Sequence, residues 1–297
     1  MRAVAEFVMK SRGRAIGSAV ATAFVPVLSL VSCAIVALVW LRMGRNEGIK
    51  VLLAAAIPGL YYWLGLGSPD VLLALIGAAV LAEVLHSQQG WSRMLLIGAF
   101  LASLVALSVQ WLSPDMLREV INLLLDQGGL AQQYNLSASD QEQLRLMFGL
   151  LLNGVITGVQ LIMLIVSMAL ARWWQGLLYN PGGFQQEFHA LRLPAWSGLV
   201  LPLVMVVVAS GQSWLMPVIP VLVVPHLIAG LALIHGIFGI KQYNSFWLGL
   251  LYVTLLFALP YMSVLLVLIA LADSLMNFRH RLAPPPPPPP RDGDGES

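Results

Sequence analysis

The residues of this sequence that could do chemistry are polar side chains set inside long apolar runs. Six residues stand out in this way: Glu83, Asn153, Gln160, His226, His235 and Asp273. Polar groups are costly inside a membrane, so each of them is a candidate for binding a ligand, an ion or a proton. Which of these roles applies depends on how the surrounding helices bring the six together.

Glu83, His235 and Asp273 each lie near one end of a different apolar run. If those ends meet, the three form one polar cluster, with His235 paired to a carboxylate and open to a ligand or a proton. The simpler interpretation, which the sequence favours, is that each side chain reaches the headgroup layer or a local capping donor. Asp273 also precedes Arg279 by six residues, which allows an electrostatic contact at the helix end.

Asn153 and Gln160 are seven residues apart, so they share one face of a predicted helix. Gly154 and Gly158 form a G-x-x-x-G pattern beside them. This combination is typical of close helix packing with hydrogen bonds between helices. It favours that role over the lining of a solute path or pore, which stays open as the alternative.

His226 follows Pro225 in an apolar run that also contains Pro217 and Pro220. Proline removes a backbone donor and kinks a helix, and broken helices near the membrane midplane are typical of transporter solute sites. His235 is nine residues further on, on the other side of a straight helix, so the two histidines are not expected to face one cavity.

Several classes of function lack their sequence signatures. The chain has no H-E-x-x-H, G-x-S-x-G, Walker A or Rossmann glycine pattern, so we expect no catalytic activity. Its one cysteine, Cys33, excludes an internal disulfide, and no Cys/His spacing suits a metal, so neither a metal nor another cofactor is expected. No basic face outside the apolar runs is large enough to predict binding of nucleic acid.

The chain has 297 residues, of which 59% are hydrophobic and 10% charged. A soluble domain carries about 25% charged residues, and a helix of about 20 apolar residues crosses a bilayer. We therefore predict an all-α, polytopic transmembrane helix bundle that forms one integral membrane domain over 1–282. Residues 283–297, Pro-rich and then charged, are expected to be a disordered cytoplasmic tail. The apolar segments are 15–41, 49–66, 70–86, 91–112, 146–170, 195–211, 215–240 and 246–278.

One crossing per segment would place Arg42, Arg45 and Lys50 opposite the basic N-terminus, against the positive-inside rule. We therefore predict that 15–41 is bent near Pro26 and enters and leaves on the same side. Each half, about a dozen residues long, would be too short to cross a core of about 30 Å. The alternative is a single tilted helix, because the 27 residues of 15–41 can span a membrane.

The last segment, 246–278, is predicted to be a hairpin broken near Pro260. The result is about eight spans plus an N-terminal re-entrant or broken helix, with both termini in the cytoplasm. Of the 16 Lys and Arg residues, Arg118 and Arg145 alone then lie outside. Both belong to a net acidic outside loop, 113–145.

A second loop, 171–194, is predicted to lie on the cytoplasmic membrane surface. Phe184, Phe188 and Leu191 recur there at the spacing of one helix face, and Pro194 closes the stretch. Aromatic residues precede this helix, as in the belt that marks a membrane interface.

Three stretches resemble the YybS-like family, a family of uncharacterised bacterial multi-pass membrane proteins. They are Asn180-Pro-Gly-Gly-Phe184 with the following 187–193, Gly230-Leu-Ala-Leu-Ile-His235, and Ala272-Asp273 with Asn277-Phe278-Arg279. The resemblance covers 1–282. The chain departs from it at Ser274-Leu275-Met276, where the family would have an aromatic residue, so packing there is expected to differ.

The resemblance implies location in the bacterial cell inner membrane and an architecture similar to the substrate-binding subunits of energy-coupling-factor vitamin transporters. It implies no established activity. We therefore expect a solute-binding or transport-related subunit whose partners are the lipid bilayer, a small-molecule solute and a membrane or cytoplasmic protein. The alternative is a non-catalytic membrane scaffold or envelope-organising interaction protein. Transport predicts a hydrated cavity near Glu83, His235 and Asp273, whereas a scaffold predicts a dry bundle.

Overall fold

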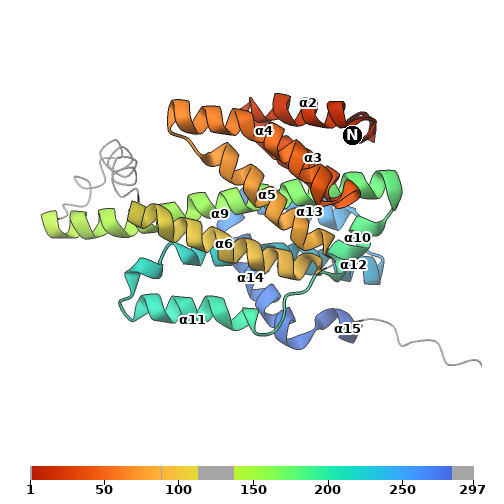
Figure 1. Cartoon of the computed structure of the whole chain (residues 1–297). Helices are drawn as coiled ribbons and strands as arrows, with labels where there is room; N and C mark the ends of the chain where they lie inside the picture. The colour runs from red at the N-terminus through yellow and green to blue at the C-terminus, as the bar shows by residue number, and fades with distance from the viewer. Residues whose placement is uncertain (1, 88, 113–136, 283–297) are drawn as a thin grey trace, which may run out of the picture.

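Helices account for all the regular structure in the part of the chain that the computed structural model describes, residues 2–87, 89–112 and 137–282 (Figure 1). The all-α prediction is confirmed. The elements are α1 (Arg2–Met9), α2 (Arg12–Ala23), η1 (Pro26–Leu28), α3 (Ser29–Met43), α4 (Arg45–Leu66), α5 (Asp70–His86), α6 (Gly90–Leu112), α9 (Ala138–Tyr179), α10 (Gly183–Ala190), α11 (Ser197–Ala209), η2 (Ser213–Leu215), α12 (Val218–Lys241), α13 (Phe246–Phe257), α14 (Leu259–Met276) and α15 (Phe278–Leu282).

Six of the described helical stretches are long and apolar enough to cross a membrane. They are Pro26–Met43, Arg45–Leu66, Gly90–Trp111, Ser139–Tyr179, Val218–Lys241 and Leu259–Met276. The apolar helices α11 and α13 are shorter, with 13 and 12 residues. The chain thus has the helices of a membrane protein, and the count of eight crossings stays a prediction. Most of the predicted outside loop, 113–136, and the tail, 283–297, lie outside the described residues.

The predicted break near Pro26 is present. α2 ends at Ala23, a 3-10 turn begins at Pro26, and α3 starts at Ser29. The two helices pack side by side, and the Ser32 hydroxyl donates a hydrogen bond of 2.8 Å to the carbonyl of Ala19. A single tilted helix over 15–41 is therefore wrong: the chain turns back where proline removes a backbone donor.

The returning half of this hairpin is longer than expected. Counted from Pro26 it has 18 residues, because the helix continues to Met43 and stops only at Gly44, whose φ is 84°. The prediction that both halves are too short to cross is wrong for this half. Its length matches the span that a bilayer core requires.

The hairpin of α2 and α3 also lies along most of α4. Arg12 Nε is 2.9 Å from Glu47 Oε2 at one end, and the Tyr62 hydroxyl donates to the carbonyl of Phe24 at the other. From Glu47 to Tyr62 is about 22 Å of helix. The hairpin therefore extends nearly as far along the bundle as α4 does. The basic segments before α2 and after α3 lie at the same end of the structure.

The other predicted hairpin is broken at Ala258, two residues before Pro260. Ala258 has φ −123° and ψ 37°, outside the helical region, so α13 ends there and α14 begins. Pro260 occupies the first turn of α14, where its missing N–H leaves no hydrogen bond unmade. α13 packs against α12 through a contact of 3.1 Å between the Tyr252 hydroxyl and His235 Nε2.

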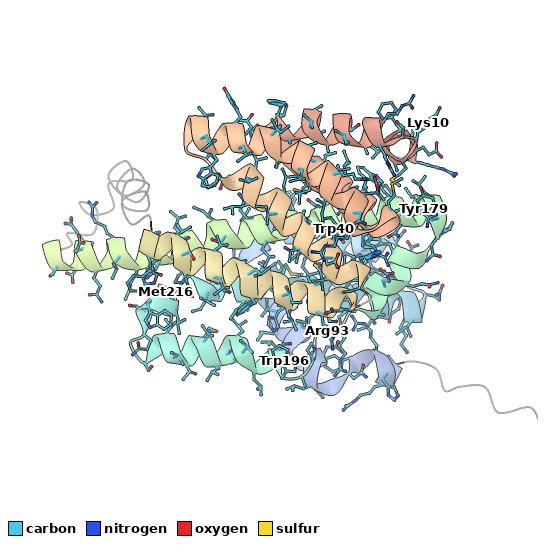
Figure 2. All side chains as sticks on the ribbon, in the orientation of Figure 1. Lys10, Trp40, Arg93, Tyr179, Trp196 and Met216 are labelled. Carbon is cyan, nitrogen blue, oxygen red and sulfur yellow. The ribbon has the colours of Figure 1, made fainter. Side chains whose placement is uncertain are left out.

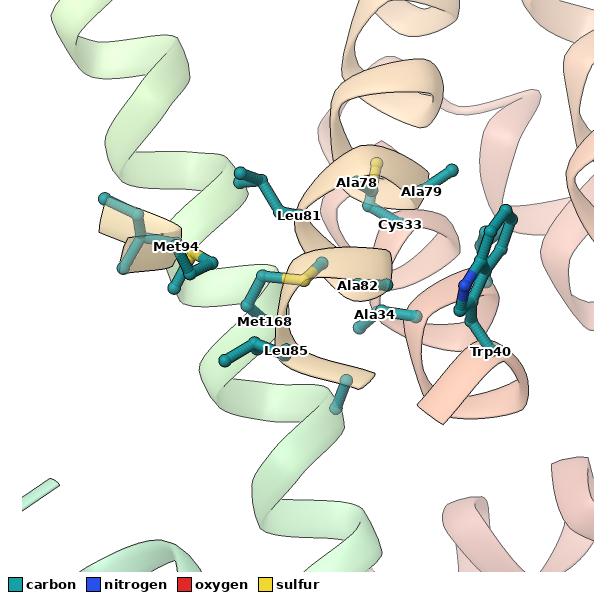
Figure 3. Packing of buried hydrophobic residues seen from close by; sticks show 14 of the residues in the cluster. Cys33, Ala34, Trp40, Ala78, Ala79, Leu81, Ala82, Leu85, Met94 and Met168 are labelled. Carbon is teal, nitrogen blue, oxygen red and sulfur yellow. The ribbon is translucent and has the colours of Figure 1, made fainter. Parts of the chain in front are cut away.

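Small side chains allow the central helices to approach closely. Figure 3 shows Cys33 and Ala34 of α3 facing Ala78 and Ala82 of α5, and all four are buried. Small residues at helix contacts let backbones approach, which is how membrane helices gain packing energy without a hydrophobic effect. The contact between α3 and α5 is therefore apolar and tightly packed.

Most of the described Lys and Arg side chains gather at one end of the bundle, which we call the basic end. Figure 2 shows Lys10, Arg93 and Tyr179 on the side away from Met216. Arg42 lies over the Tyr179 ring, with 4.1 Å between its Cζ and the ring centroid, which joins the end of α3 to the end of α9. α10, the helix predicted within 171–194, closes this end.

Candidate functional site

Glu83, His235 and Asp273 all lie toward the basic end, but each has its own partner there. Glu83 Oε2 accepts a hydrogen bond of 2.6 Å from Trp40 Nε1, between α5 and α3. The His235 ring is bonded to the carbonyl of Leu231 and to the Tyr252 hydroxyl. Among the hydrogen bonds of the described residues, none joins one of the three to another.

Asp273 is the most buried of the three, with 3% of its surface exposed. Its Oδ1 accepts a hydrogen bond of 2.8 Å from the backbone N–H of Phe278, and its Oδ2 is 3.1 Å from Arg279 Nη1. The contact that the six-residue spacing allowed is thus an ion pair. It holds α15 against the end of α14, where Asn277 takes a left-handed conformation with φ 50°.

Arg192 also binds the C-terminal end of α14. Its Nε donates to the carbonyl of Asp273 at 2.9 Å, and its Nη2 to the carbonyl of Ser274 at 2.7 Å. Both carbonyls belong to the last turn of α14. That of Asp273 also accepts the N–H of Asn277 at 3.0 Å, whereas that of Ser274 lies where intrahelical donors run out. The carbonyl of Arg192 in turn accepts a hydrogen bond of 2.6 Å from the Ser92 hydroxyl, so α6 and α14 are joined through it.

A second arginine fixes α10. Arg172 Nε donates to Glu187 Oε2 at 3.1 Å, and its Nη2 donates to Glu187 Oε1. Trp91 Nε1 donates to the same carboxylate at 3.0 Å. α10 is therefore fastened to α9 and α6 by a two-pronged, charge-assisted contact, the strong form of an arginine–carboxylate pair.

An open depression of about 520 Å³ lies between α10 and α12 at this end. Its lining residues are Gln185, Gln186, His189, Ala190, Gly236, Gly239, Ile240 and Gln242. A Cβ at Gly236 would lie 2.7 Å from the carbonyl oxygen of His189 and 2.8 Å from Arg279 Nε. Glycine at this position therefore lets α10 and Arg279 reach the surface of α12.

Arg279 carries a buried positive charge beside the depression. Burial lowers the pKa of its guanidinium, the neighbouring Asp273 raises it, and Arg192 lowers it again. Its Nη1 is used by Asp273, whereas its Nε and Nη2 are buried with no hydrogen-bond partner among the described residues. The environment is therefore more favourable to a further negative charge than to a positive one.

Sequence reasoning missed His189 as a site residue and treated Arg279 only as an anchor. His189 stands on a short amphipathic helix, where it resembles any surface residue. The available signal was Gly236-x-x-Gly239 at the end of α12, since paired glycines on one helix face allow another backbone to approach. A Cβ at Gly239 would lie 2.9 Å from His189 Nδ1.

Asn153 and Gln160 have different surroundings. Asn153 is buried and its Nδ2 donates a hydrogen bond of 2.7 Å to the carbonyl of Ala106, joining α9 to α6. Gln160 is exposed, because the helices that cover α9 change along its 42 residues. A Cβ at Gly154 would lie 2.4 Å from the carbonyl oxygen of Pro217, so this glycine serves the contact between α9 and α12.

His226 lies within a continuous helix and not at a break. Pro217 and Pro220 fall at the start of α12, where proline is tolerated, and the helix passes through Pro225 to Lys241. His226 is 2% exposed, with Nδ1 bonded to the carbonyl of Leu222 at 2.8 Å. The sequence signal for a broken-helix solute site is therefore not matched by a break in the structure.

The pKa of His189 gives a test of this geometry. Burial lowers it below the ordinary value, and the neighbouring His235 and then Arg279 lower it further. We expect His189 to resist protonation as the pH falls, and His235→Gln to raise its pKa. NMR titration of the ring carbons in the micelle-bound protein would measure this, with His86→Gln on α5 as control. An unchanged value in His235→Gln would contradict the contact of 6.4 Å between the two ring centroids.

Comparison with known proteins gives no match: no family model, no curated protein and no solved structure is similar to this chain. The resemblance to the YybS-like family thus stays an expectation from three short stretches. Function has to be argued from the basic end of the bundle itself.

Proposed function

We propose that this chain is a non-catalytic subunit of the bacterial inner membrane that binds a small solute at its basic end, as part of transport. The supporting observation is the depression between α10 and α12, set beside the buried guanidinium of Arg279. In this proposal the chain crosses the membrane eight times. The positive-inside rule puts the basic end, with both termini, in the cytoplasm.

The depression suits a small polar molecule. Its volume of about 520 Å³ lies within the range of about 300–1,000 Å³ that is typical of ligand sites. Gln185, Gln186 and Gln242 provide amides that can donate or accept hydrogen bonds, and His189 adds an imidazole. The contact between Arg172 and Glu187 fixes α10, so one wall of the site is held in place.

Two observations favour the scaffold alternative: the apolar, tightly packed contacts between the central helices, as expected for a dry bundle, and the exposure of Gln160. This residue lies twelve positions before Arg172, or about 18 Å of helix from the basic end. An amide facing lipid at that depth is costly, and a helix of a partner protein would satisfy it. A transport subunit also needs partner helices, so this contact is compatible with either function.

A thermal-shift screen of the purified chain against vitamins and other metabolites tests the proposal. A ligand at a hundred times its Kd is expected to stabilise the fold by about 2.7 kcal/mol. Gly239→Leu fills the depression and should abolish the shift. Gly249→Leu, where an added Cβ meets no atom within 4 Å, should retain it. A broad screen without a stabilising ligand, together with a protein cross-linked through position 160, would favour the scaffold.

A further inference from the structure

Three arginines at the basic end present the same edge of the guanidinium to different partners. The edge formed by Nε and Nη2 of Arg172 binds the carboxylate of Glu187. The same edge of Arg192 binds the carbonyls of Asp273 and Ser274, at 2.9 and 2.7 Å. In Arg279 this edge is buried and has no partner among the described residues.

Asp273 does not fill this edge of Arg279. One of its oxygens accepts the N–H of Phe278, and the other is 3.1 Å from Nη1. Two buried, charged donors without acceptors are costly to the fold. They point in parallel, so they match two oxygens carried on one atom, as in a carboxylate or a phosphate.

The unfilled edge is next to the depression between α10 and α12. The position that a Cβ would take on Gly236 is 2.8 Å from Arg279 Nε, and Gly236 lines the depression together with His189. Arg279 itself is not among the residues that line the depression, and both nitrogens are buried, so a group in the depression reaches this edge when the Arg279 side chain turns toward it. The local charges favour an anion, because Arg192 contacts the same helix end as Arg279 and Asp273 already has its own hydrogen-bond donors.

We propose that the ligand of this site is an anion with two oxygens on one atom, a carboxylate or a phosphate, bound by the Nε and Nη2 edge of Arg279. This inference rests on the proposed function and specifies the class of its solute. The same chemistry is found in a free solute and in the headgroup of an anionic lipid at the membrane surface. The experiment distinguishes the two sources.

The full chain is purified in dodecyl maltoside, a detergent without phosphate or carboxylate, and its melting temperature is measured with added probes. The probes are inorganic phosphate, acetate and phosphatidylglycerol. We expect at least one to stabilise the wild type with a saturable dose response. Arg279→Lys keeps a positive charge beside Asp273 but has no parallel pair of donors, so affinity should fall about tenfold to a hundredfold.

The matched control is Arg281→Lys, on the same short helix, where the side chain is exposed. It should bind the probes as the wild type does. Should Arg279→Lys fail to fold, Gly236→Ala is compared with Gly239→Ala. The Cβ of Gly236→Ala would lie 2.8 Å from Arg279 Nε and 2.7 Å from the carbonyl oxygen of His189, whereas that of Gly239→Ala would press on the His189 ring alone. Loss of binding in Gly236→Ala with retention in Gly239→Ala supports the proposal, and full retention in both overturns it.

The outcomes separate this inference from the proposed function. Stabilisation by phosphate or acetate identifies a free solute, and stabilisation by phosphatidylglycerol alone identifies a lipid headgroup. Equal binding by Arg279→Lys and wild type overturns the assignment to Arg279. If the anions do not bind but a neutral or cationic metabolite does, and Gly239→Leu abolishes it, the anion class is wrong and solute binding stands. If no compound binds, both are overturned.

Discussion

Gly230→Ala is expected to destabilise the bundle by about 2–3 kcal/mol, the cost of adding a methyl group to a contact with no room for it. A Cβ at Gly230 would lie 2.3 Å from the carbonyl oxygen of Leu266, 2.9 Å from its carbonyl carbon and 3.1 Å from its Cα. All three atoms belong to the backbone of α14, so no side-chain rotation can relieve the overlap. α14 has to move away from α12.

The free energy of unfolding can be measured by titrating the micelle-bound protein with a denaturing detergent. The control is Gly249→Ala in α13, where an added Cβ meets no atom within 4 Å. It should be neutral or stabilising by up to about 1 kcal/mol, because alanine favours a helix more than glycine does. Equal stabilities of the two variants would mean that α12 and α14 do not meet at Gly230.

The contrast between these two glycines shows what the sequence could predict. Gly230 belongs to one of the stretches that carry the family resemblance, which drew attention to it without giving its contact. The hairpin turn at Pro26 was predictable, because a missing backbone donor acts locally. The length of α3 was not, since the helix ends where Gly44 adopts a positive φ.

The clustering of basic residues at one end could be predicted from the sequence, whereas the contacts that they make there could not. The sequence placed Arg42, Arg45 and Lys50 on the same side as the basic N-terminus, since Lys and Arg at the ends of apolar segments are expected on one side of the membrane. It could not show that His235 would pair with Tyr252, because that choice depends on how α13 folds back on α12. The contact between Asp273 and Arg279 could be predicted from the sequence, because both residues lie at one helix end.

Asp273→Ala should be the most destabilising change at this end, by about 3–5 kcal/mol, the cost of leaving a buried charge without its partner. The side chains of Asp273 and Arg279 are 4% and 12% exposed. Alanine also removes the acceptor for the N–H of Phe278. Asp273→Asn keeps that acceptor and removes only the charge, so it should cost less than alanine.

The double variant Asp273→Asn with Arg279→Gln should recover much of the loss, because no buried charge is then unpaired. The control is Glu6→Gln, in an exposed pair with Arg2 whose side chains are 70% and 55% exposed. Such surface pairs contribute little, so its effect should be far smaller. An Asp273→Asn variant as stable as Glu6→Gln would show that the buried pair does not hold α15 in place.

Asp273→Asn also separates a structural role from a binding role. The carboxylate of Asp273 repels any anion that approaches Arg279, so its removal should strengthen phosphate or acetate binding even as the fold becomes easier to unfold. If Asp273 only holds α15 against α14, the opposite is expected, since a loosened helix end would weaken anion binding together with stability. Measuring both quantities on one variant therefore decides whether the pair of Asp273 and Arg279 only fastens a helix end or also sets the affinity of a site.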